Sequence, residues 1–455
     1  MRRAERRALA ALTTLGATAA VARLRALQSL SPPDLAFFHQ ATWNAAQGNG
    51  FVQTALEFDA GSLLGSVHLS LIRVVWVPLY ALMPAPETLV ALQGAVLMGG
   101  TAAVAGLIAG SRARSATWLI VLGLHPMTVA LATCDLRPLT FIVAPSLLVI
   151  AGLLHARTPF VVLGAAGAIL AREEAWMLLS ALLPFAIVST RAHRKPRLLF
   201  ALASAIITAW ALPRAIWGHG ANVSANADLF GTLQALWNGD RDWFRWPVEL
   251  YFAARCMLAA WPAVRCPELL VPAAVGWLGL MVFSNMEPSA PVHGGLHYLA
   301  VLAPLLLGAA AVGWHRICRD APSTARSARS WWVVAGIVLA SPELGRMLHW
   351  TQAALHRSPL AHEITRVRHA PGGVLALPSV APLLSGRPVL RIQGHFSPTP
   401  GRVATVASEI DHALLTTERP ADGPPAEEWD TWQSALPAAG LNIRTTVEGV
   451  QVWER

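Results

Sequence analysis

The chain has 455 residues, of which 54% are hydrophobic and only 13% are charged, and its mean hydropathy is +0.47. A soluble globular domain carries about 25% charged residues because its surface faces water. The composition therefore excludes a chain built only of soluble domains. The formal net charge of +9 does not indicate nucleic acid, because most basic residues stand in short clusters between apolar runs, as in membrane proteins.

Two features of residue usage bear on the source and on covalent chemistry. Among the 35 basic residues only Lys195 is a lysine, and this bias toward arginine is typical of a GC-rich genome. The cysteines are scattered and form no C-x-x-C motif, so neither a disulfide framework nor a zinc site is indicated. They are Cys134, Cys256, Cys266 and Cys318.

The chain begins with a basic segment, Met1–Arg7, which precedes an apolar stretch from about Ala8 to Leu27. No small-residue cleavage site follows, so we expect a retained first helix rather than a removed signal peptide. Because cytoplasmic segments are enriched in arginine and lysine, the N terminus is predicted to lie in the cytoplasm.

Further basic clusters predict which connections face the cytoplasm, and an even number of crossings must separate them. The clusters are Arg112 with Arg114, His155–Arg157, Arg191–Arg197, Arg265 and Arg316–Arg329. About eleven spans satisfy this pattern, most of them near the ~20 residues that a bilayer requires. They are Ala8–Leu27, Thr88–Gly110, Ala116–Thr133, Leu139–Leu154, Phe160–Leu170, Met177–Val188, Leu198–Trp217, Val248–Val264, Leu269–Ser284, Tyr298–Trp314 and Trp331–Ala340.

An odd number of spans places the C terminus outside, so we predict a multi-pass protein of the bacterial inner membrane with an extracytoplasmic tail. The fold class is mainly α, a polytopic transmembrane bundle with a small C-terminal α/β domain. The predicted domains are 1–341, which includes an outer loop at 31–87 with interfacial helices, and 342–455. Short β-like runs in the tail support the second domain: Gly373–Ala376, Pro388–Ile392 and Val447–Trp453.

Asp34 is the first candidate for chemistry. It follows Ser31-Pro32-Pro33 directly outside the first predicted span and opens an amphipathic run. One interpretation is structural, with Ser31 as N-cap and Asp34 in the first turn of a helix. The other is catalytic, and the two are compatible.

The rest of the first outer segment reads largely as helices at the membrane surface, with tryptophan and Tyr80 at the level of the lipid headgroups. His68 enters an apolar run with Arg73 about one turn further on. A lone histidine there is either a satisfied hydrogen-bonding residue or a ligand for substrate.

Two charged motifs lie at predicted turns on the same side. Asp135-Leu-Arg137 precedes Pro138 and fits either an ion pair at a helix start or a binding role. Arg172-Glu173-Glu174 places three consecutive charges at the edge of the membrane. Because such groups are costly next to lipid, a functional role is the favoured interpretation.

The last outer turn, before the tenth span, carries His293-Gly-Gly-Leu-His297-Tyr298. Two imidazoles beside a flexible glycine pair fit a loop over a ligand, and they also fit a plain surface turn.

In order and spacing, these motifs resemble a bacterial family of polytopic membrane proteins, a domain-of-unknown-function family grouped with the GT-C glycosyltransferases. Arg137 stands where that family more often has histidine. The resemblance covers nearly the whole chain and rests on Asp34–Asn44, His68–Tyr80, Pro84–Gln93, Asp135–Pro138, Arg172–Glu174, His297-Tyr298 and Pro371–Arg387.

The resemblance implies a transferase that takes a sugar from a polyprenyl-phosphate carrier and passes it to an acceptor at the outer face. Asp34 would be the general base that removes a proton from the acceptor hydroxyl. Cationic groups would hold the phosphate leaving group. The residues expected to bind substrate are Arg172, His68 and Arg137 at the phosphate, Asp135 with no assigned position, Glu173 and Glu174 at Arg172 or sugar hydroxyls, and His297 and Tyr298 at the carrier's entry.

The expected partners are the lipid bilayer, a polyprenyl-phosphate-linked sugar and an acceptor whose identity stays open. No cofactor is expected, and a requirement for a divalent metal is left open. Two other functions remain. A transporter or lipid-handling protein would use intramembrane charges without covalent chemistry, although the chain shows no matching halves of the inverted-repeat kind. A non-catalytic scaffold of the same fold is the third.

Overall fold

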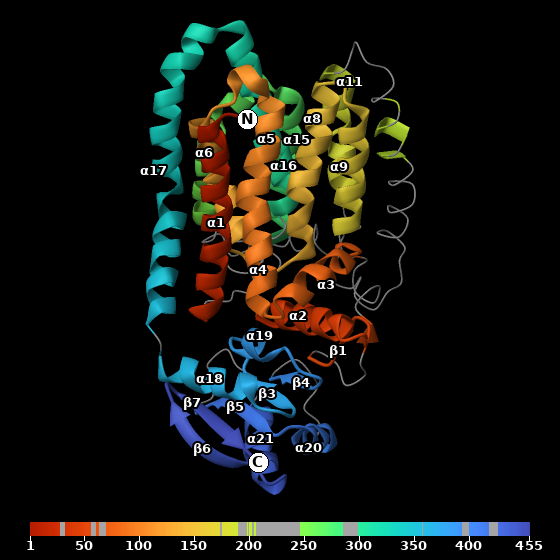
Figure 1. Cartoon of the computed structure of the whole chain (residues 1–455), viewed down its shortest axis with the longest axis vertical. Helices are drawn as coiled ribbons and strands as arrows, with labels where there is room; N and C mark the ends of the chain where they lie inside the picture. Colours follow the sequence, from red (N-terminus) through yellow and green to blue (C-terminus); the bar gives the residue numbers. More distant parts are fainter. Residues whose placement is uncertain are drawn as a thin grey trace, which may run out of the picture. The chain divides into compact units, whose positions relative to one another are not determined.

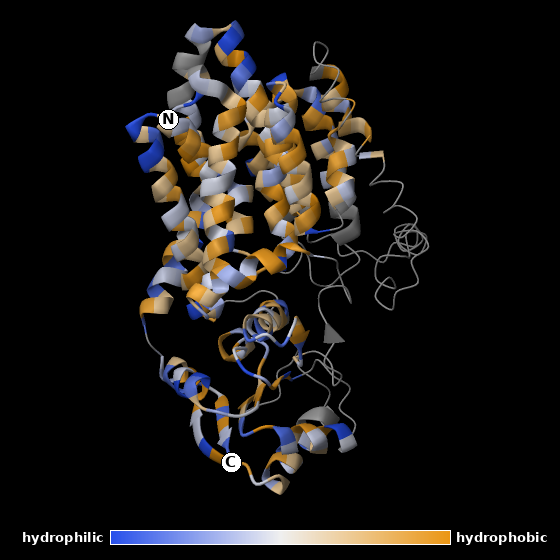
Figure 2. Ribbon diagram, turned by 45° about the vertical axis from the view of Figure 1, so that its right-hand side comes forward, coloured by the Kyte–Doolittle hydropathy of each residue, from blue (hydrophilic) through white to orange (hydrophobic). Residues whose placement is uncertain are grey.

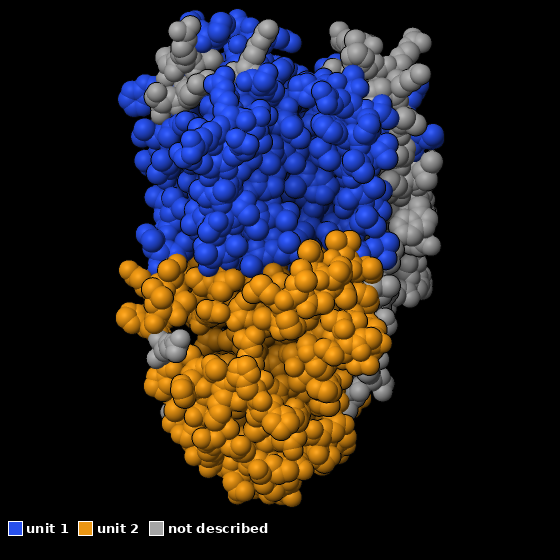
Figure 3. Space-filling model, viewed as in Figure 1, with its two compact units in different colours: residues 1–20, 70–72, 91–348 blue, residues 21–69, 73–90, 349–455 orange. Residues whose placement is uncertain are grey.

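The computed structural model describes residues 1–27, 32–55, 61–62, 70–172, 175–189, a few positions between 198 and 205, 246–284, 299–356, 358–393, 400–417 and 426–455. It separates into two compact units, coloured in Figure 3. Unit 1 holds residues 1–20, 70–72 and 91–348, and unit 2 holds 21–69, 73–90 and 349–455.

All regular elements described in unit 1 are helical, and many of them run side by side in Figure 1. Three of its helices (α1, α4 and α17) continue into the residues of unit 2. The elements are α1 (Arg3–Arg25), α4 (Pro86–Ala95), η1 (Val96–Gly100), α5 (Thr101–Ala113), α6 (Ala116–Gly123), α7 (Pro126–Ala132), η2 (Pro138–Ile142), α8 (Val143–Leu154), α9 (Thr158–Ala171), α10 (Ala175–Ala181), α11 (Leu183–Ser189), α14 (Trp246–Ala259), η5 (Trp261–Arg265), α15 (Pro267–Ser284), α16 (Leu299–Asp320) and α17 (Pro322–Leu355).

Each predicted span that falls within the described residues lies on one helical element or on two or three consecutive ones, and the mainly helical class is confirmed. Most of the predicted span Leu198–Trp217 lies outside the described residues. Within the described part, two helices are long and apolar enough by themselves to cross a bilayer, Pro86–Ser111 and Leu299–Asp320. The number of spans stays a prediction.

The predicted span Ala116–Thr133 is divided into α6 and α7 by His125-Pro126. Proline suits the first position of a helix but not its interior, so α7 begins at Pro126. His125 Nδ1 accepts the Met127 N–H at 3.3 Å, and its Nε2 therefore donates to the Cys256 carbonyl at 3.0 Å. The histidine thus caps one helix and bonds to another.

Among the described residues, the basic clusters that contain Arg114 and His155 lie at one end of unit 1, together with His315. Arg114 pairs with Glu5 at 3.0 Å. Two imidazoles donate to carbonyls near the break of α5 at Gly110, His315 to Ala109 at 2.9 Å and His155 to Leu107 at 3.0 Å. Figure 2 shows hydrophilic residues at this end, near the N terminus, and hydrophobic ones along the helices. The positive-inside interpretation requires this gathering, while the orientation stays a prediction.

A buried ion pair joins α14 to α17 in unit 1. Arg255 donates from Nη1 to Glu343 Oε1 at 3.0 Å and pairs with Oε2 through Nη2, and both side chains are almost fully buried. Arg255 Nε also donates to the Leu339 carbonyl at 2.8 Å. Charges away from water persist only when paired, so this pair sets the register of α17 on α14.

We predict that Arg255→Leu strongly lowers the apparent Tm of the purified protein, because it leaves Glu343 buried with only the partly exposed Arg346 as partner. Removing one member of such a pair costs about 3–5 kcal/mol. The double variant Arg255→Leu/Glu343→Leu loses much less, since no unpaired charge remains. Thermal melting followed by size-exclusion chromatography checks this, and additive losses in the double variant would contradict it.

Unit 2 combines α2 and α3 from the first outer segment with an α/β tail. Its tail strands form one five-stranded sheet in the order β4-β3-β5-β7-β6, with β3 parallel to β4 and β5. The elements are α2 (Pro32–Ala46), β1 (Val52–Gln53), β2 (Gly61–Ser62), α3 (Ile72–Leu82), α18 (Pro359–His369), β3 (Val374–Ala376), α19 (Ala381–Leu384), β4 (Leu390–Ile392), α20 (Pro400–Glu409), β5 (His412–Thr416), α21 (Ala426–Ala438), β6 (Asn442–Val447) and β7 (Val450–Glu454).

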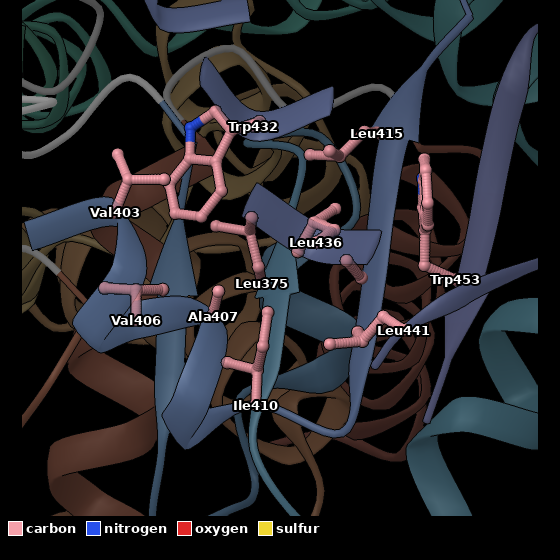
Figure 4. Close-up of a cluster of buried hydrophobic side chains, with 11 residues drawn as sticks. Leu375, Val403, Val406, Ala407, Ile410, Leu415, Trp432, Leu436, Leu441 and Trp453 are labelled. Atoms are coloured by element: carbon pink, nitrogen blue, oxygen red, sulfur yellow. The ribbon is translucent and has the colours of Figure 1, made fainter. Parts of the chain in front are cut away.

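The core of the tail lies between the sheet and the helices α20 and α21 (Figure 4). Trp432 is fully buried there and packs among aliphatic side chains from the strands and helices. The cluster consists of Leu375, Val403, Val406, Ala407, Ile410, Ala413, Leu415, Trp432, Leu436, Leu441 and Trp453.

Two of the predicted β-like runs in the tail are strands, β3 and β4, but the third is not one strand. The run Val447–Trp453 contains a turn at Glu448-Gly449, whose φ angles are +48° and +74°. Two consecutive positive φ values make the tight turn of a β-hairpin, so the run ends β6 and begins β7. A glycine preceded by a charged residue was the available signal.

A candidate site in two parts

Asp34 lies in the first turn of α2, in unit 2, and is partly exposed. An acidic side chain is favourable at this position because the N-terminal N–H groups carry partial positive charge. The predicted N-cap, Ser31, lies outside the described residues. Downstream of Asp34 the helix is buried on nearly all sides, from Leu35 through Thr42. Asp34 therefore marks the accessible start of an otherwise enclosed helix.

His39 connects α2 to the tail and to α3. Ser385 Oγ lies 2.7 Å from the Pro382 carbonyl and 2.7 Å from His39 Nδ1. A carbonyl only accepts, so the hydroxyl donates to Pro382 and accepts from Nδ1–H. The neutral imidazole then accepts the Tyr80 O–H at Nε2, at 2.8 Å. Because both ring nitrogens have hydrogen-bond partners, His39 is assigned the tautomer with its proton on Nδ1.

The next residue, Gln40, makes a second connection to the tail. Its fully buried amide accepts the Thr54 N–H at 2.9 Å and donates to the Thr54 hydroxyl at 2.9 Å and to the Arg387 carbonyl at 3.1 Å. The Thr54 hydroxyl in turn accepts the Leu390 N–H of β4 at 3.0 Å. Thus one buried amide joins α2, the segment after β1 and the edge of the tail sheet.

Arg387 holds the tail segment that His39 and Gln40 contact. Its guanidinium donates to three carbonyls, those of Leu384 at 2.8 Å, Gly372 at 3.0 Å and Val367 at 2.8 Å. Burial lowers the pKa of Arg387 to about 10, because it disfavours the charged form. The bond to Gly372 joins the two ends of the Pro371–Arg387 motif singled out in the sequence.

Glu87 completes this polar network in unit 2. Arg368 of α18 donates to both carboxylate oxygens, at 3.1 and 3.0 Å, in the two-point geometry that suits a guanidinium. Arg25 lies 3.6 Å from the same carboxylate. Residues from α1, α4 and the tail therefore meet at one carboxylate.

In unit 1, Gln93 organises the turn that carries Asp135 and Arg137. Its fully buried amide donates to the Cys134 carbonyl at 2.9 Å and accepts the Arg137 N–H at 3.0 Å and the Thr140 hydroxyl at 3.0 Å. The Asp135 side chain is buried, and Arg137 is half-buried. The turn is therefore held by Gln93 of α4 as well as by α7 and η2, which it connects.

Arg172 stands at the break between α9 and α10, in an extended conformation and almost fully buried. It lies at the same end of unit 1 as the Asp135 turn, because α8 and α9 run antiparallel. A Cβ on Gly152 would lie 2.7 Å from the Val161 nitrogen, and one on Gly164 would lie 2.5 Å from the Pro145 carbonyl. Further along this antiparallel pair, η2, which precedes α8, lies beside the end of α9.

Ser70 reaches the same place from the first outer segment. Its buried hydroxyl donates to the Ala171 carbonyl at 2.6 Å, one residue before Arg172. This bond satisfies a carbonyl that the end of α9 leaves without a helical partner. The motif that begins at His68 is thereby connected to the Arg172 motif within unit 1.

The structure thus brings Asp135, Arg137 and Arg172 to one end of unit 1, and places Asp34 in unit 2. The other predicted binding residues lie outside the described residues: His68, Glu173, Glu174, His297 and Tyr298. Among the residues that are described, no group of three or more His, Cys, Asp or Glu side chains could hold a metal ion.

Several polar residues with buried hydrogen bonds, in one unit or the other, were not singled out from the sequence. Gln40 and Gln93 were part of the quoted motifs, but neither was assigned a role. The available signal was an amide side chain within a mostly apolar run. Such an amide is buried with its neighbours and must then be hydrogen-bonded. Tyr80, expected at the level of lipid headgroups, is instead fully buried because its hydroxyl is bonded to His39.

The architecture is that of a helical membrane protein with a small α/β tail, and comparison with known proteins names the family. Residues 25–407 match the family model described as "Predicted membrane protein (DUF2079)", and the chain belongs to that family. No curated protein sequence matches it. Among solved structures, the crystal structure of ArnT from Cupriavidus metallidurans in the apo state is similar, with 16% identity, a TM-score of 0.49 and 93% of each chain covered.

The His39 network predicts a pH dependence of stability. Burial, with a smaller effect of Arg368, lowers the pKa of His39 from 6.5 to about 3. As the pH falls from 6.5 toward 3, the unfolded chain binds a proton that the folded protein does not. The free energy of unfolding therefore falls, by up to ~1.4 kcal/mol per pH unit.

Replacing His39 with a side chain that does not titrate removes its contribution to the pH dependence of the free energy of unfolding. We expect His39→Gln to have a lower apparent Tm than the wild type at pH 7.5, and a smaller further decrease between pH 6.5 and 4. Thermal melting at a series of pH values measures both. Parallel pH profiles for the two proteins would contradict the assignment.

Proposed function

We propose that this protein is a glycosyltransferase of the bacterial inner membrane that moves a sugar from a polyprenyl-phosphate carrier to an acceptor at the outer face. In this proposal the N terminus is cytoplasmic and the tail is extracytoplasmic. The proposal combines the GT-C resemblance of the sequence motifs with the chemistry of the residues at the end of unit 1.

The observation that carries the proposal is the position of Arg172. The break after α9 lies at the end of an apolar bundle, so Arg172 stands at the same end as the Asp135–Arg137 turn. The basic clusters described above lie near the opposite ends of α5, α8 and α16. A buried arginine at the border between apolar helices and water suits a lipid phosphate, which it can bind through two parallel hydrogen bonds.

Asp34 is proposed as the general base. A partly exposed carboxylate in the first turn of the helix can be approached by an acceptor hydroxyl, and the helix itself is held by His39 and Gln40. Removal of the hydroxyl proton would accompany attack on the anomeric carbon while the phosphate leaves. Arg172 and Arg137 would stabilise the negative charge that develops on that phosphate.

The carrier site predicts selective loss of lipid binding. We expect native mass spectrometry of the detergent-purified protein to detect a bound polyprenyl phosphate in the wild type, less in Arg172→Lys and none in Arg172→Ala. Lysine retains the charge but not the two-point geometry. Arg157→Ala is the matched control, because Arg157 precedes the other end of α9 and is exposed.

Equal loss of lipid in Arg157→Ala and Arg172→Ala would contradict a specific carrier site. The absence of lipid from the wild type after polyprenyl phosphate is added in excess would reject the donor and favour the transporter or scaffold. The buried charged pair Arg255–Glu343 does not by itself favour transport, because its hydrogen bonds are made within the pair, to a backbone carbonyl and to Arg346.

The general base predicts a separate effect on turnover. We expect Asp34→Asn to reduce release of polyprenyl phosphate from lipid-linked sugar by about 10²–10⁴-fold, the usual contribution of general base catalysis. Asparagine is nearly isosteric and keeps one acceptor oxygen at the start of the helix, so we expect folded yield and lipid binding to be unchanged. Undiminished turnover, or loss of folded protein, would defeat the assignment.

A further inference from the structure

The helix α3 has a polarity opposite to that of an ordinary surface helix. Its buried side chains include the ones that carry polar atoms, Arg73, Trp76 and Tyr80, each at most 2% exposed. The outward side chains are all apolar. Those of Val74, Val75, Leu79 and Leu82 are between 43% and 79% exposed.

The exposed residues form one continuous stripe. Val74, Val75, Pro78, Leu79 and Leu82 recur at the spacing that aligns side chains on one face of an α-helix. Isolated apolar residues on a surface are common, but a contiguous apolar face marks a surface that binds something apolar.

The inward face is fixed by its partners, so the helix cannot roll to hide the stripe. The Arg73 guanidinium lies over the Phe38 ring of α2, 4.6 Å from its centroid. The Tyr80 hydroxyl is bonded to His39 at 2.8 Å. These two contacts, about two helical turns apart, orient α3 against α2, beside which it is drawn in Figure 1.

We propose that this stripe binds the hydrocarbon of the lipid bilayer, so that α3 lies in the plane of the membrane surface. The chain itself indicates this occupant. Only three residues separate Leu82 from Pro86, where the helix that is long and apolar enough to cross a bilayer begins. Three residues reach about 10 Å, so α3 lies at the border of that bilayer.

The face has the chemistry that lipid requires. Its exposed side chains carry neither charge nor hydrogen-bonding groups, and Met83 continues it past the end of the helix. Helices of this kind bury their apolar face about 5–10 Å into the boundary between headgroups and acyl chains. α2 is buried on nearly all sides and offers no comparable face.

The proposal assigns α3 a role that does not depend on glycosyl transfer. It also fixes the depth of the His39–Tyr80 pair, because Tyr80 lies on the side of α3 that faces away from the proposed lipid. The start of α2 would then be held at the membrane surface, within reach of a lipid headgroup.

Collision accessibility of spin labels tests the proposal in the full chain. Single cysteines replace Val75 or Leu79 on the stripe, and Thr405 on α20 as an exposed polar control, in a Cys318→Ser background because the other three native cysteines are buried. Each labelled protein is placed in vesicles of phosphatidylcholine and phosphatidylglycerol. Oxygen concentrates in hydrocarbon, whereas a water-soluble nickel chelate does not enter it.

We expect the ratio of oxygen to nickel collisions at Val75→Cys and Leu79→Cys to exceed that at Thr405→Cys several-fold. Nickel collisions as frequent as at Thr405 would show that the stripe faces water and would overturn the proposal. Low collision rates with both reagents would also overturn it, because they would mean that protein covers the stripe. Val74→Cys and Leu82→Cys replace any variant that fails to fold.

Discussion

The hydrogen bonds between His39, Gln40 and the Ser385–Pro388 segment are the interaction on which unit 2 depends. These side chains are buried, so water cannot replace a partner that is lost. An unpaired buried donor or acceptor costs about 1–3 kcal/mol. Helix α2 and the tail segment therefore satisfy their polar groups only together. The enclosed polar network explains why the first outer segment and the C-terminal tail form one compact unit, although His39 and Ser385 are 346 positions apart in the sequence.

The same constraint acts on unit 1 through different residues. Gln93 satisfies groups of a turn about 40 positions away, and Arg255 satisfies Glu343 across 88 positions. In an apolar bundle the hydrophobic effect does not distinguish one helix register from another. Buried polar contacts of this kind do, because only one register pairs every group. The turn that carries Asp135 and Arg137 is therefore as fixed as the helices on which it rests.

Local patterns predicted much of the fold and only part of the candidate site. Apolar length and basic clusters located the helices, and short β-branched runs located β3 and β4. The position of Asp34 in a first turn and of Arg172 at a break between apolar runs followed from proline, charge and hydropathy. The partners of His39 could not follow in this way, because Ser385 lies 346 positions further along the chain. No local pattern encodes which distant hydroxyl a buried imidazole meets.

In helix α3, hydropathy alone does not predict which apolar residues face the protein. Its apolar run indicates burial, yet the run contains two kinds of apolar position. Trp76 faces the protein, while Val75 and Leu79 face outward. What separates the two kinds is the polar residues between them, since Arg73 and Tyr80 must turn toward partners that the protein supplies. When the polar side chains of a helix find their partners inside, its apolar side chains are left to the surroundings, and a bilayer is the surrounding in which that arrangement is stable.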